Sequence, residues 1–530
     1  MRNSTDEITF RTVDALRTAL GDLRPEHDTP IGVVHPYWAR KPMNVVETII
    51  RHLSSVDDFV VDPFMGSGTT VFAALSTHRR AAGSDISPMA QHLVEGVLDL
   101  IENAKVLLPE IRRILDVHSF ETLSWFAVDD ESFIERERYR VDGDFGHGAF
   151  TLTLTEVVTK KRRAATWGMR TARSDQRTLS EVIGQRALPL ASTRAIVDFD
   201  AISLPPNSRI AIPQGATLAQ YFTVQNQASI NVLLGLISDS PLVAKHAAAL
   251  KLVLSASLPL LRLSDKKASS QWPYWRPKTD LTSRNPIMVL NARFRQIEKM
   301  VEWAHDSIPV ARVPNAFQLL TLPAQELTHT HLNQTPFLVL TDPPYGDQVP
   351  YGEYAAMWNG VLDLAVPASA HSHELVRSDA QHRQIDSDAY LDRLAEAFAA
   401  NATLLGPTGF LAWFYQDQDL RCWNTIYEAA SKAGVFLIDV IPIPKQRRSL
   451  KTVTSPNTTL DGDLLCVFSR LSAAPDRFAN DTEKRPAPAA GSTYFGRYAA
   501  MIAAALRSGD ITRLADKYGT VKRALAAGEG

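Results

Sequence analysis

The sequence predicts an α/β fold in which helices cover both faces of a doubly wound, mostly parallel sheet. Short apolar runs that read as buried strands alternate with amphipathic helical segments near the N-terminus and again after residue 317. A Gly-x-Gly turn directly follows the first of these strands, and a proline-rich turn directly follows a later one. The stretch between the two regions lacks this alternation, so we expect a large mixed α+β insertion there.

The first strand–helix units are expected in residues 31–119, after a polar helical lead-in at residues 1–30. Apolar residues recur at helical spacing ahead of the first strand, and Pro42 suits the start of that helix. Ser87 and Pro88 likewise mark the start of a long helix. The elements expected here are a helix at 42–53, a strand at 59–61, a helix from 71, a strand at 81–86 and a helix from 88 to beyond 100.

The insertion is expected at residues 120–300, and the second half of the sheet at residues 301–470. No long helix separates the last two strands, which predicts a closing antiparallel pair. Residues 471–530 read as a linker rich in Pro, Ala and Asp, followed by a small helical tail. The expected elements are a hairpin at 150–158, helices at 230–237, 242–261, 390–405 and 423–432, and strands at 337–340, 409–415, 435–443 and 464–468.

Composition sets limits on the class of protein. Lys and Arg number 56 against 58 Asp and Glu, and the formal net charge is -2, so a nucleic-acid surface would have to be a local patch. Two cysteines, Cys422 and Cys466, exclude a disulfide framework and a cysteine-ligated zinc ribbon, and they suit a reducing compartment. No apolar stretch resembles a signal peptide or a membrane span. We therefore expect a cytoplasmic protein.

The turn after the first strand reads Asp-Pro-Phe-Met-Gly-Ser-Gly-Thr-Thr, residues 62–70. Glycines let the backbone approach a ligand closely, and open α/β sheets bind ligands at the carboxyl ends of their strands. A P-loop would need a lysine after Gly68, and a dinucleotide fingerprint would need a third glycine where Val71 stands. Asp85 ends the next expected strand, where a carboxylate can bind the two hydroxyls of a ribose. A tight turn without a ligand is the remaining alternative.

The second turn, Asp342-Pro343-Pro344-Tyr345, directly follows the apolar strand at 337–340. Its two prolines fix the backbone and remove two donors, which leaves carbonyl oxygens free to accept hydrogen bonds. An exocyclic amino group of a base is a poor nucleophile because its lone pair is conjugated with the ring. The Asp342 carboxylate and the Pro343 carbonyl would accept its two hydrogens and favour a pyramidal nitrogen, while Tyr345 would stack on the base. A rigid proline turn without function is the alternative.

Several clusters of basic, aromatic or histidine residues lie outside the two turns. The basic and aromatic ones suit phosphate contact and base stacking, and a solvated loop or an aromatic core explains them equally well. The histidine pairs have no acidic or cysteine partners at metal-like spacing, so we expect no metal site. The clusters are Lys160-Lys161-Arg162-Arg163, Lys445-Gln446-Arg447-Arg448, Lys266-Lys267 with Trp272, Tyr274, Trp275 and Arg276, and the pairs His329/His331 and His371/His373.

Together, the two turns resemble the signatures of the amino-group DNA methyltransferases, Phe-x-Gly-x-Gly and Asp/Asn/Ser-Pro-Pro-Tyr/Phe/Trp. Residues 35–42 are similar to the His-Pro…Lys-Pro segment that precedes the cofactor strand in many members. Residues 345–351 and 414–417 resemble a subgroup of bacterial adenine-specific methylases. Some members of that subgroup carry a cysteine zinc ribbon, whose cysteines this sequence lacks. The resemblance covers residues 31–103 and 314–470 and does not extend firmly to the insertion.

The resemblance implies a seven-stranded methyltransferase (Rossmann-like) sheet, with S-adenosyl-L-methionine as cofactor and double-stranded DNA as substrate. It also implies a flipped-out target base, with adenine N6 favoured because cytosine N4 enzymes often carry serine in place of Asp342. The insertion lies where one class of these enzymes has its target-recognition domain, and a restriction or defence-system protein would be a fitting partner. The implied residues are His35, Lys41, Asp62, Phe64, Gly66, Gly68 and Asp85 for the cofactor, and Asp342, Pro343, Pro344 and Tyr345 for the base.

Three alternatives stay open at this point. A cytosine N4 DNA methyltransferase carries both turns as well. An RNA or protein amide methyltransferase also uses the proline-rich turn, although such enzymes usually lack a long insertion between the motifs. A non-catalytic DNA-binding subunit on the same fold is the third alternative, and the intact Asp342 and both turn glycines argue against it.

Overall fold

The computed structural model describes the 530-residue chain with several gaps. Residues 445–448 lie wholly outside the description, and residues 266–276 do so except for Trp275. Residues 162 and 163 of the cluster at 160–163 lie outside it, as do the side chains of Lys161 and His371. The residues outside the description are 1–3, 27, 39, 129–131, 145–148, 162–194, 266–274, 276–279, 309–315, 347–348, 379, 381, 445–459, 472–492 and 530.

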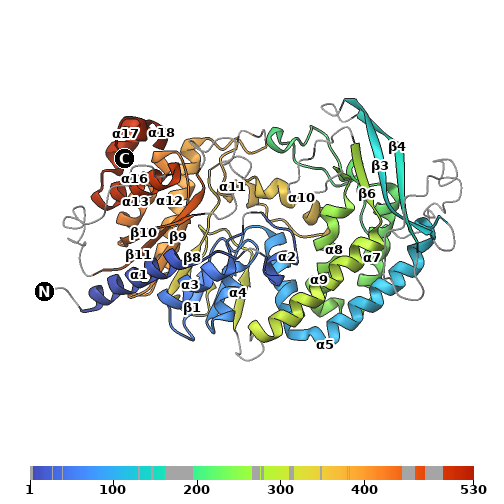
Figure 1. The fold of residues 1–530 in the computed structure, drawn as a ribbon, viewed down its shortest axis with the longest axis horizontal. Helices are drawn as coiled ribbons and strands as arrows, with labels where there is room; N and C mark the ends of the chain where they lie inside the picture. The colour runs from blue at the N-terminus through green and yellow to red at the C-terminus, as the bar shows by residue number, and fades with distance from the viewer. Residues whose placement is uncertain are drawn as a thin grey trace.

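Seven strands form one sheet in the order β10-β11-β9-β8-β1-β2-β7 (Figure 1). The strands from β9 to β7 along this order run parallel, whereas β11 runs antiparallel to both β9 and β10. This confirms the predicted mostly parallel sheet and its closing antiparallel pair. The strands are β1 Phe59–Asp62, β2 Arg80–Ser84, β7 Phe317–Leu320, β8 Leu338–Thr341, β9 Phe410–Tyr415, β10 Phe436–Pro444 and β11 Gly462–Ser469.

Helices cover both faces of the sheet, and each face has its own hydrophobic core. Val60 points into the core that contains α3, α4 and α5, whereas its neighbour Val61 points into the core that contains α12, α13 and α16 (Tyr494–Ser508). This alternation buries the central parallel strands on both sides, as their continuous apolar sequences require. The helices are α1 Ser4–Asp22, α2 Pro30–Val33, α3 Met43–Leu53, α4 Thr69–Ser76, α5 Pro88–Thr122, α12 Ser387–Thr403 and α13 Leu420–Lys432.

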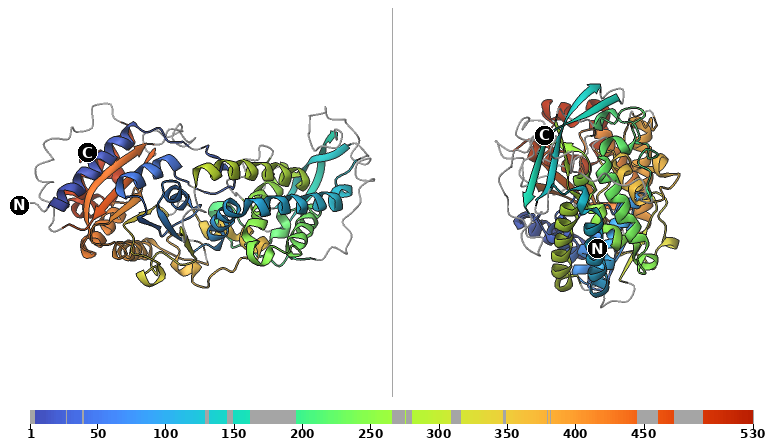
Figure 2. Two further views of the ribbon diagram at one scale, coloured as in Figure 1. Left: turned by 90° about the horizontal axis from the view of Figure 1, so that it is seen from below. Right: turned by 90° about the vertical axis from the view of Figure 1, so that its right-hand side faces the viewer.

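The insertion begins within the long helix α5, which continues past the sheet and packs with three further helices (Figures 1 and 2). A four-stranded antiparallel sheet, in the order β4-β3-β6-β5, lies beyond them. The assignment of residues 120–300 to target recognition stays a prediction. The elements are β3 Ser132–Asp144, β4 Ala149–Lys161, α7 Val224–Ser238, α8 Val243–Leu261, β5 Ser264–Asp265, β6 Asp280–Arg284 and α9 Pro286–Ser307.

Among the described residues, α8 is long and apolar enough to cross a membrane, judged by length and composition alone. Of its most apolar window, 61% is buried inside the protein, and α8 packs against both α5 and α9. The core helix of a soluble protein passes the same test, and α8 packs as such a helix does.

The N-terminal helix and the C-terminal tail meet at one buried carboxylate of the sheet. Arg17 of α1 donates to Asp439 Oδ2 of β10 at 2.6 Å, and Arg507 of the tail donates to Asp439 Oδ1. Asp439 is 2% exposed, so these contacts fix both ends of the chain on the sheet. The tail consists of α16 Tyr494–Ser508, α17 Ile511–Tyr518 and α18 Val521–Ala526.

Candidate functional site: one cavity between two turns

The glycine turn holds Asp85 through backbone N–H groups. Gly66 and Gly68 both have positive φ, +52° and +79°, which explains why glycine stands at these two positions. Gly66 N donates to Asp85 Oδ2 at 2.8 Å, and Ser87 N donates to Asp85 Oδ1 at 2.9 Å. Burial raises the pKa of Asp85 to about 6, although the two N–H donors oppose this shift. β2 ends at Ser84, one residue before Asp85.

Asp62 links the glycine turn to the proline-rich turn. It ends β1 and is 4% exposed, and the hydroxyl of Thr341 at the end of β8 donates to Asp62 Oδ1 at 2.6 Å. Phe64 N donates to the same oxygen at 3.1 Å. Burial raises the pKa of Asp62 to about 7. Because β1 and β8 are parallel neighbours, both turns lie at the same edge of the sheet.

The proline-rich turn carries a compact ionic cluster. Lys41 Nζ lies 3.0 Å from Asp342 Oδ2 and 3.0 Å from Asp463 Oδ2 at the start of β11. Lys41 also donates to Tyr345 OH at 3.0 Å, and Tyr345 OH donates to Asp342 Oδ1. Burial alone would lower the pKa of Lys41, but the two carboxylates raise it above its usual value. Burial raises the pKa of Asp342, and Lys41 opposes that shift.

Buried tyrosines hold the proline-rich turn from the interior of the protein. Tyr390 OH accepts a hydrogen bond from Gly346 N at 2.9 Å and donates to the carbonyl of Pro344 at 3.3 Å. Its other neighbour is Tyr415 OH at 3.0 Å. Both tyrosine side chains are fully buried, so the backbone on either side of Tyr345 is held from the protein interior.

A single cavity of about 660 Å³ lies between the two turns. Its volume falls within the range of small-molecule sites, roughly 300–1,000 Å³. Seven of the eleven predicted site residues line it: Lys41, Asp62, Phe64, Gly66, Asp85, Asp342 and Pro344. Gly68, Pro343, Tyr345 and His35 are not part of the lining. The structure therefore brings residues of both turns to one cavity.

Comparison with known proteins gives a consistent result. A sequence model of the DNA methylase family of N6 and N4 methyltransferases matches residues 20–95. Type II methyltransferase M.MjaII of Methanocaldococcus jannaschii is 27% identical over 131 residues, which cover 24% of this chain and 23% of the relative. Type II methyltransferase M.MjaI of the same organism is 30% identical over 99 residues, or 16% of this chain and 33% of the relative. The alignments thus span about a quarter to a third of these relatives, and no solved structure matches.

Residues 20–95 are thus similar to the amino-group DNA methyltransferases, and both relatives are type II methyltransferases. Members of this family use S-adenosyl-L-methionine as methyl donor. The cavity of this chain fits that cofactor on two counts. A Cβ atom at Gly66 would lie 3.2 Å from the Tyr37 ring. Glycine avoids this close contact and leaves the backbone of the turn accessible to a ligand in the cavity. The Asp85 carboxylate offers paired acceptors for a ribose, and its pKa of about 6 keeps it mostly ionised at neutral pH.

Two residues of segment 35–42, which precedes β1, differ in their position relative to the cavity: Lys41 lines it and His35 does not. Lys41 contacts the proline-rich turn, although the family resemblance implied cofactor binding for it. His35 is 1% exposed, and its Nδ1 lies 2.7 Å from Pro36 O while its Nε2 lies 2.7 Å from Ser255 Oγ. Burial lowers the pKa of His35 well below its usual value, so it is neutral. Its predicted part in cofactor binding has no direct contact to support it.

Sequence reasoning missed three residues at this site. Asp463 holds Lys41, Phe414 lies with its ring centroid 5.0 Å from Lys41 Nζ, and Glu374 lines the cavity. Phe414 belongs to residues 414–417, which resemble adenine-specific methylases, so the sequence could have indicated a role for it at the site. Asp463 and Glu374 have no motif around them, and only the fold brings them to the site.

The other sequence clusters have ordinary contacts where the structure describes them. Lys160 Nζ lies 2.7 Å from Glu135 Oε1, and Trp275 is 1% exposed within the insertion core. His329 Nε2 lies 2.9 Å from the Thr403 carbonyl, and His331 closes a capping box with Thr328. The described residues contain no group of three or more His, Cys, Asp or Glu suited to a metal ion. The absence of a metal from the whole chain stays a prediction.

Proposed function

We propose that this protein transfers a methyl group from S-adenosyl-L-methionine to an exocyclic amino nitrogen of double-stranded DNA, and that this nitrogen is adenine N6. One observation carries the proposal. The cavity that Gly66 and Asp85 line is the same cavity that Asp342 and Pro344 line. Methyl transfer needs donor and acceptor side by side, and the adjacent strands β2, β1 and β8 place the two turns in that relation.

The cofactor end would be held by the glycine turn. Asp85 would accept hydrogen bonds from the ribose hydroxyls, while the backbone at Gly66 and the ring of Phe64 would flank the ligand. When bound, the cofactor supplies a methyl group activated by the positive charge on its sulfonium sulfur. Asp62 acts indirectly, since its Oδ1 oxygen holds Phe64 N and the Thr341 hydroxyl and so keeps the two turns together.

The catalytic end suits a nitrogen that becomes positively charged. Asp342 would accept a hydrogen bond from the amino group, and the Pro343 carbonyl would accept the other. Both oxygens of Asp342 already have partners, so the base would take the place of Lys41 at Oδ2, and Lys41 would keep Asp463. The cluster holds two carboxylates against one ammonium, and its net negative charge would stabilise the developing positive charge.

The target base would have to leave the duplex to reach this buried cluster. Phe414 lines the cavity beside Lys41, whereas the Tyr345 hydroxyl is engaged by Asp342 and lies outside the lining. Phe414 is therefore the aromatic residue best placed to contact the base, with Tyr345 as the supporting residue. The preference for adenine rests on the aspartate of the proline-rich turn and on residues 345–351, as the sequence resemblance implies.

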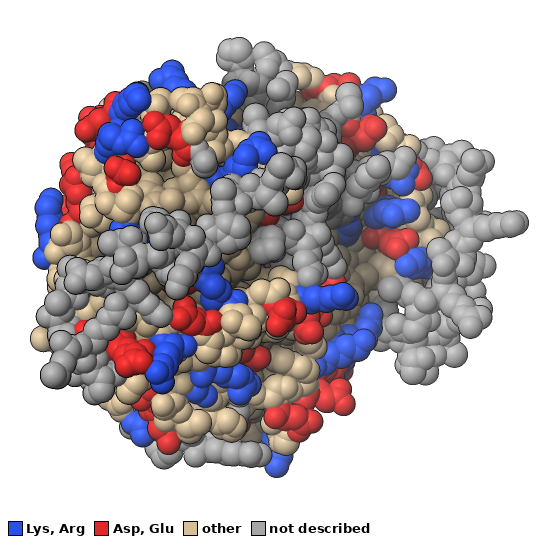
Figure 3. All heavy atoms as spheres, turned by 60° about the vertical axis from the view of Figure 1, so that its left-hand side comes forward, with Lys and Arg blue, Asp and Glu red and all other residues tan. Residues whose placement is uncertain are grey.

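Contact with the duplex would come from local patches. On the face drawn in Figure 3, acidic and basic side chains are interspersed, in agreement with a net charge of -2. We assign the sequence-reading contacts to the insertion, with Lys160 and the basic residues that follow it as the first candidates. A cytoplasmic location and a restriction or defence-system partner belong to the same proposal.

The test is transfer of a labelled methyl group from the cofactor to double-stranded DNA, with RNA and protein as competing acceptors. Mass spectrometry of the digested DNA should show N6-methyladenine. N4-methylcytosine alone would correct the target base, and label in RNA or protein would replace DNA as the substrate. Cofactor binding without any transfer would favour the non-catalytic subunit.

A further inference from the structure

Part of the cavity wall comes from the insertion. Residues 202–206 line the cavity together with α10 Tyr351–Leu362, a helix that follows the proline-rich turn. Backbone hydrogen bonds fix this segment within the insertion, since Leu204 N donates to Ala216 O at 2.9 Å and Leu218 N donates to Ile202 O at 2.9 Å. This part of the cavity wall is therefore held in place by hydrogen bonds within the insertion.

Ile202 fits a notch in α10 that only glycine provides. A Cβ atom at Gly360 would lie 2.6 Å from Ile202 Cγ2 and 3.0 Å from Ile202 Cδ1, which is too close for carbon atoms. Ile202 and Gly360 both line the cavity. α10 packs against α5, and α5 begins at Pro88, directly after the Asp85 turn. Ser87 and Pro88 line the same cavity as Ile202 and Gly360, so this wall borders the cavity that Asp85 lines.

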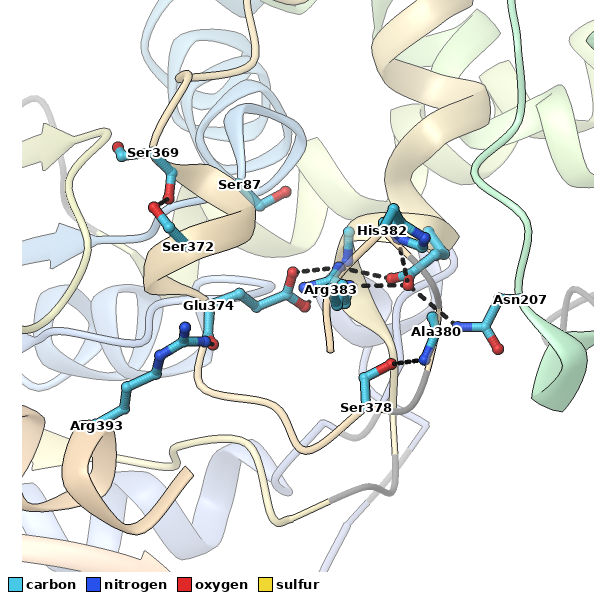
Figure 4. A network of polar contacts seen from close by, with 12 residues as sticks. Ser87, Asn207, Ser369, Ser372, Glu374, Ser378, Ala380, His382, Arg383 and Arg393 are labelled. Carbon is cyan, nitrogen blue, oxygen red and sulfur yellow. Dashed lines mark hydrogen bonds and ion pairs between the residues drawn. The ribbon is translucent and has the colours of Figure 1, made fainter. Parts of the chain in front are cut away.

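A buried ionic cluster joins the insertion to the same wall (Figure 4). Asn207 Nδ2 donates to Glu353 Oε1 of α10 at 3.1 Å, and Arg383 donates to the two oxygens of Glu353 at 2.9 and 2.6 Å. Arg383 Nη2 also lies 2.6 Å from Oε2 of Glu374, which lines the cavity. The side chains of Arg383 and Glu353 are 0% exposed, so the cluster is costly to separate.

We propose that the insertion completes the cofactor-binding site through residues 202–206, and that Asn207, Glu353 and Arg383 are positioning residues that hold this wall against α10. The inference rests on the proposed cofactor role of the cavity. It gives the insertion a second task beside DNA contact, because the affinity for the cofactor then depends on how the insertion sits on α10.

The experiment compares two helical glycines in the full-length protein. Gly360→Ala should weaken binding of S-adenosylhomocysteine about tenfold by calorimetry, because the new methyl group displaces Ile202. Alanine is favoured over glycine in a helix interior, so a loss of helix cannot explain weaker binding. The matched control is Gly235→Ala in α7, where a Cβ atom meets nothing within 4 Å, and it should bind as the wild type does.

Adding Ile202→Ala to Gly360→Ala should recover part of the lost affinity by making room. Equal binding by wild type and Gly360→Ala would overturn the inference, and so would a double variant no better than Gly360→Ala. A wild-type protein that does not bind S-adenosylhomocysteine would instead overturn the proposed function. The two failures are therefore distinguishable.

A second pair of variants tests the cluster. Asn207 and Asn285 are both 3% exposed in the insertion, and each caps a helical turn with its Oδ1, at Arg209 N and at Ile287 N. Asn207→Asp keeps the cap but faces Glu353 with a like charge, and it should weaken cofactor binding. Asn285→Asp loses a bond to Ile134 O and should lower the melting temperature without changing cofactor affinity. Equal loss of affinity in both variants would contradict a specific role for Asn207.

Discussion

The two ends of the cavity hold their carboxylates in different ways. At the cofactor end, Asp85 accepts hydrogen bonds from two backbone N–H groups, and Asp62 accepts them from a backbone N–H and a hydroxyl. At the catalytic end, Asp342 faces the ammonium of Lys41. Apart from the Thr341 hydroxyl, the first arrangement uses backbone groups close in sequence, whereas the second needs side chains that are far apart in the sequence.

This difference has a consequence for each end. Backbone donors only partly offset burial, so the pKa of Asp85 rises to about 6 and that of Asp62 to about 7. The ammonium opposes the same effect of burial on Asp342. Burial therefore raises the pKa of all three carboxylates, but at Asp342 the opposing group is a charged ammonium, whose place the proposed amino substrate would take.

The largest expected effect is at the catalytic end. Asp342→Ala should reduce kcat for methyl transfer by about 10³-fold or more, since it removes the carboxylate that faces the developing charge. Calorimetry should show unchanged binding of S-adenosylhomocysteine, because the cofactor end does not depend on this side chain. Turnover close to that of the wild type would contradict the assignment of the catalytic end.

Two substitutions break the cofactor end in different ways. Asp85→Ala should weaken binding of S-adenosylhomocysteine about 10- to 100-fold, the usual cost of losing hydrogen bonds to a charged group. Gly68→Val should weaken binding as well and lower the melting temperature, because its Cβ would lie 2.5 Å from Val94 Cγ2 at a φ of +79°. Unchanged affinity in both variants would place the cofactor elsewhere.

The contrast is sharpened by removing the second carboxylate of the catalytic cluster. Asp463→Asn leaves Lys41 with Asp342 as its one charged partner among the contacts described here, so the base would have to displace a more firmly held ammonium. We expect kcat to fall about tenfold and the KM for DNA to rise, with cofactor affinity unchanged. If Asp463 had a purely structural role, Asp463→Asn would instead change the melting temperature and leave the pH profile of kcat the same as in the wild type.

The same contrast explains what the sequence could predict. The glycine turn, Asp85 and the proline-rich turn are local patterns, so their places at strand ends followed from the order of residues. Lys41, Asp342 and Asp463 come from three distant segments, and their meeting depends on β11 lying beside β9. The helix α10 was not expected, because the run of small and aromatic residues from 351 to 362 has no clear helical start signal.

The smallest expected effect concerns the stability of the cofactor end. A carboxyl whose folded pKa is raised from 3.8 to about 7 loses folding free energy as pH rises between those values, because the unfolded chain releases its proton more readily. Asp62→Asn removes that loss and keeps an acceptor oxygen for Thr341 and Phe64. We expect thermal melts to show a larger gain in stability, relative to wild type, at pH 8 than at pH 5.5.

Asp116→Asn, at an exposed position, is the control and should show no such pH dependence. A variant that is equally destabilised at both pH values would mean that the ionised carboxylate, and not burial, dominates the stability at this site.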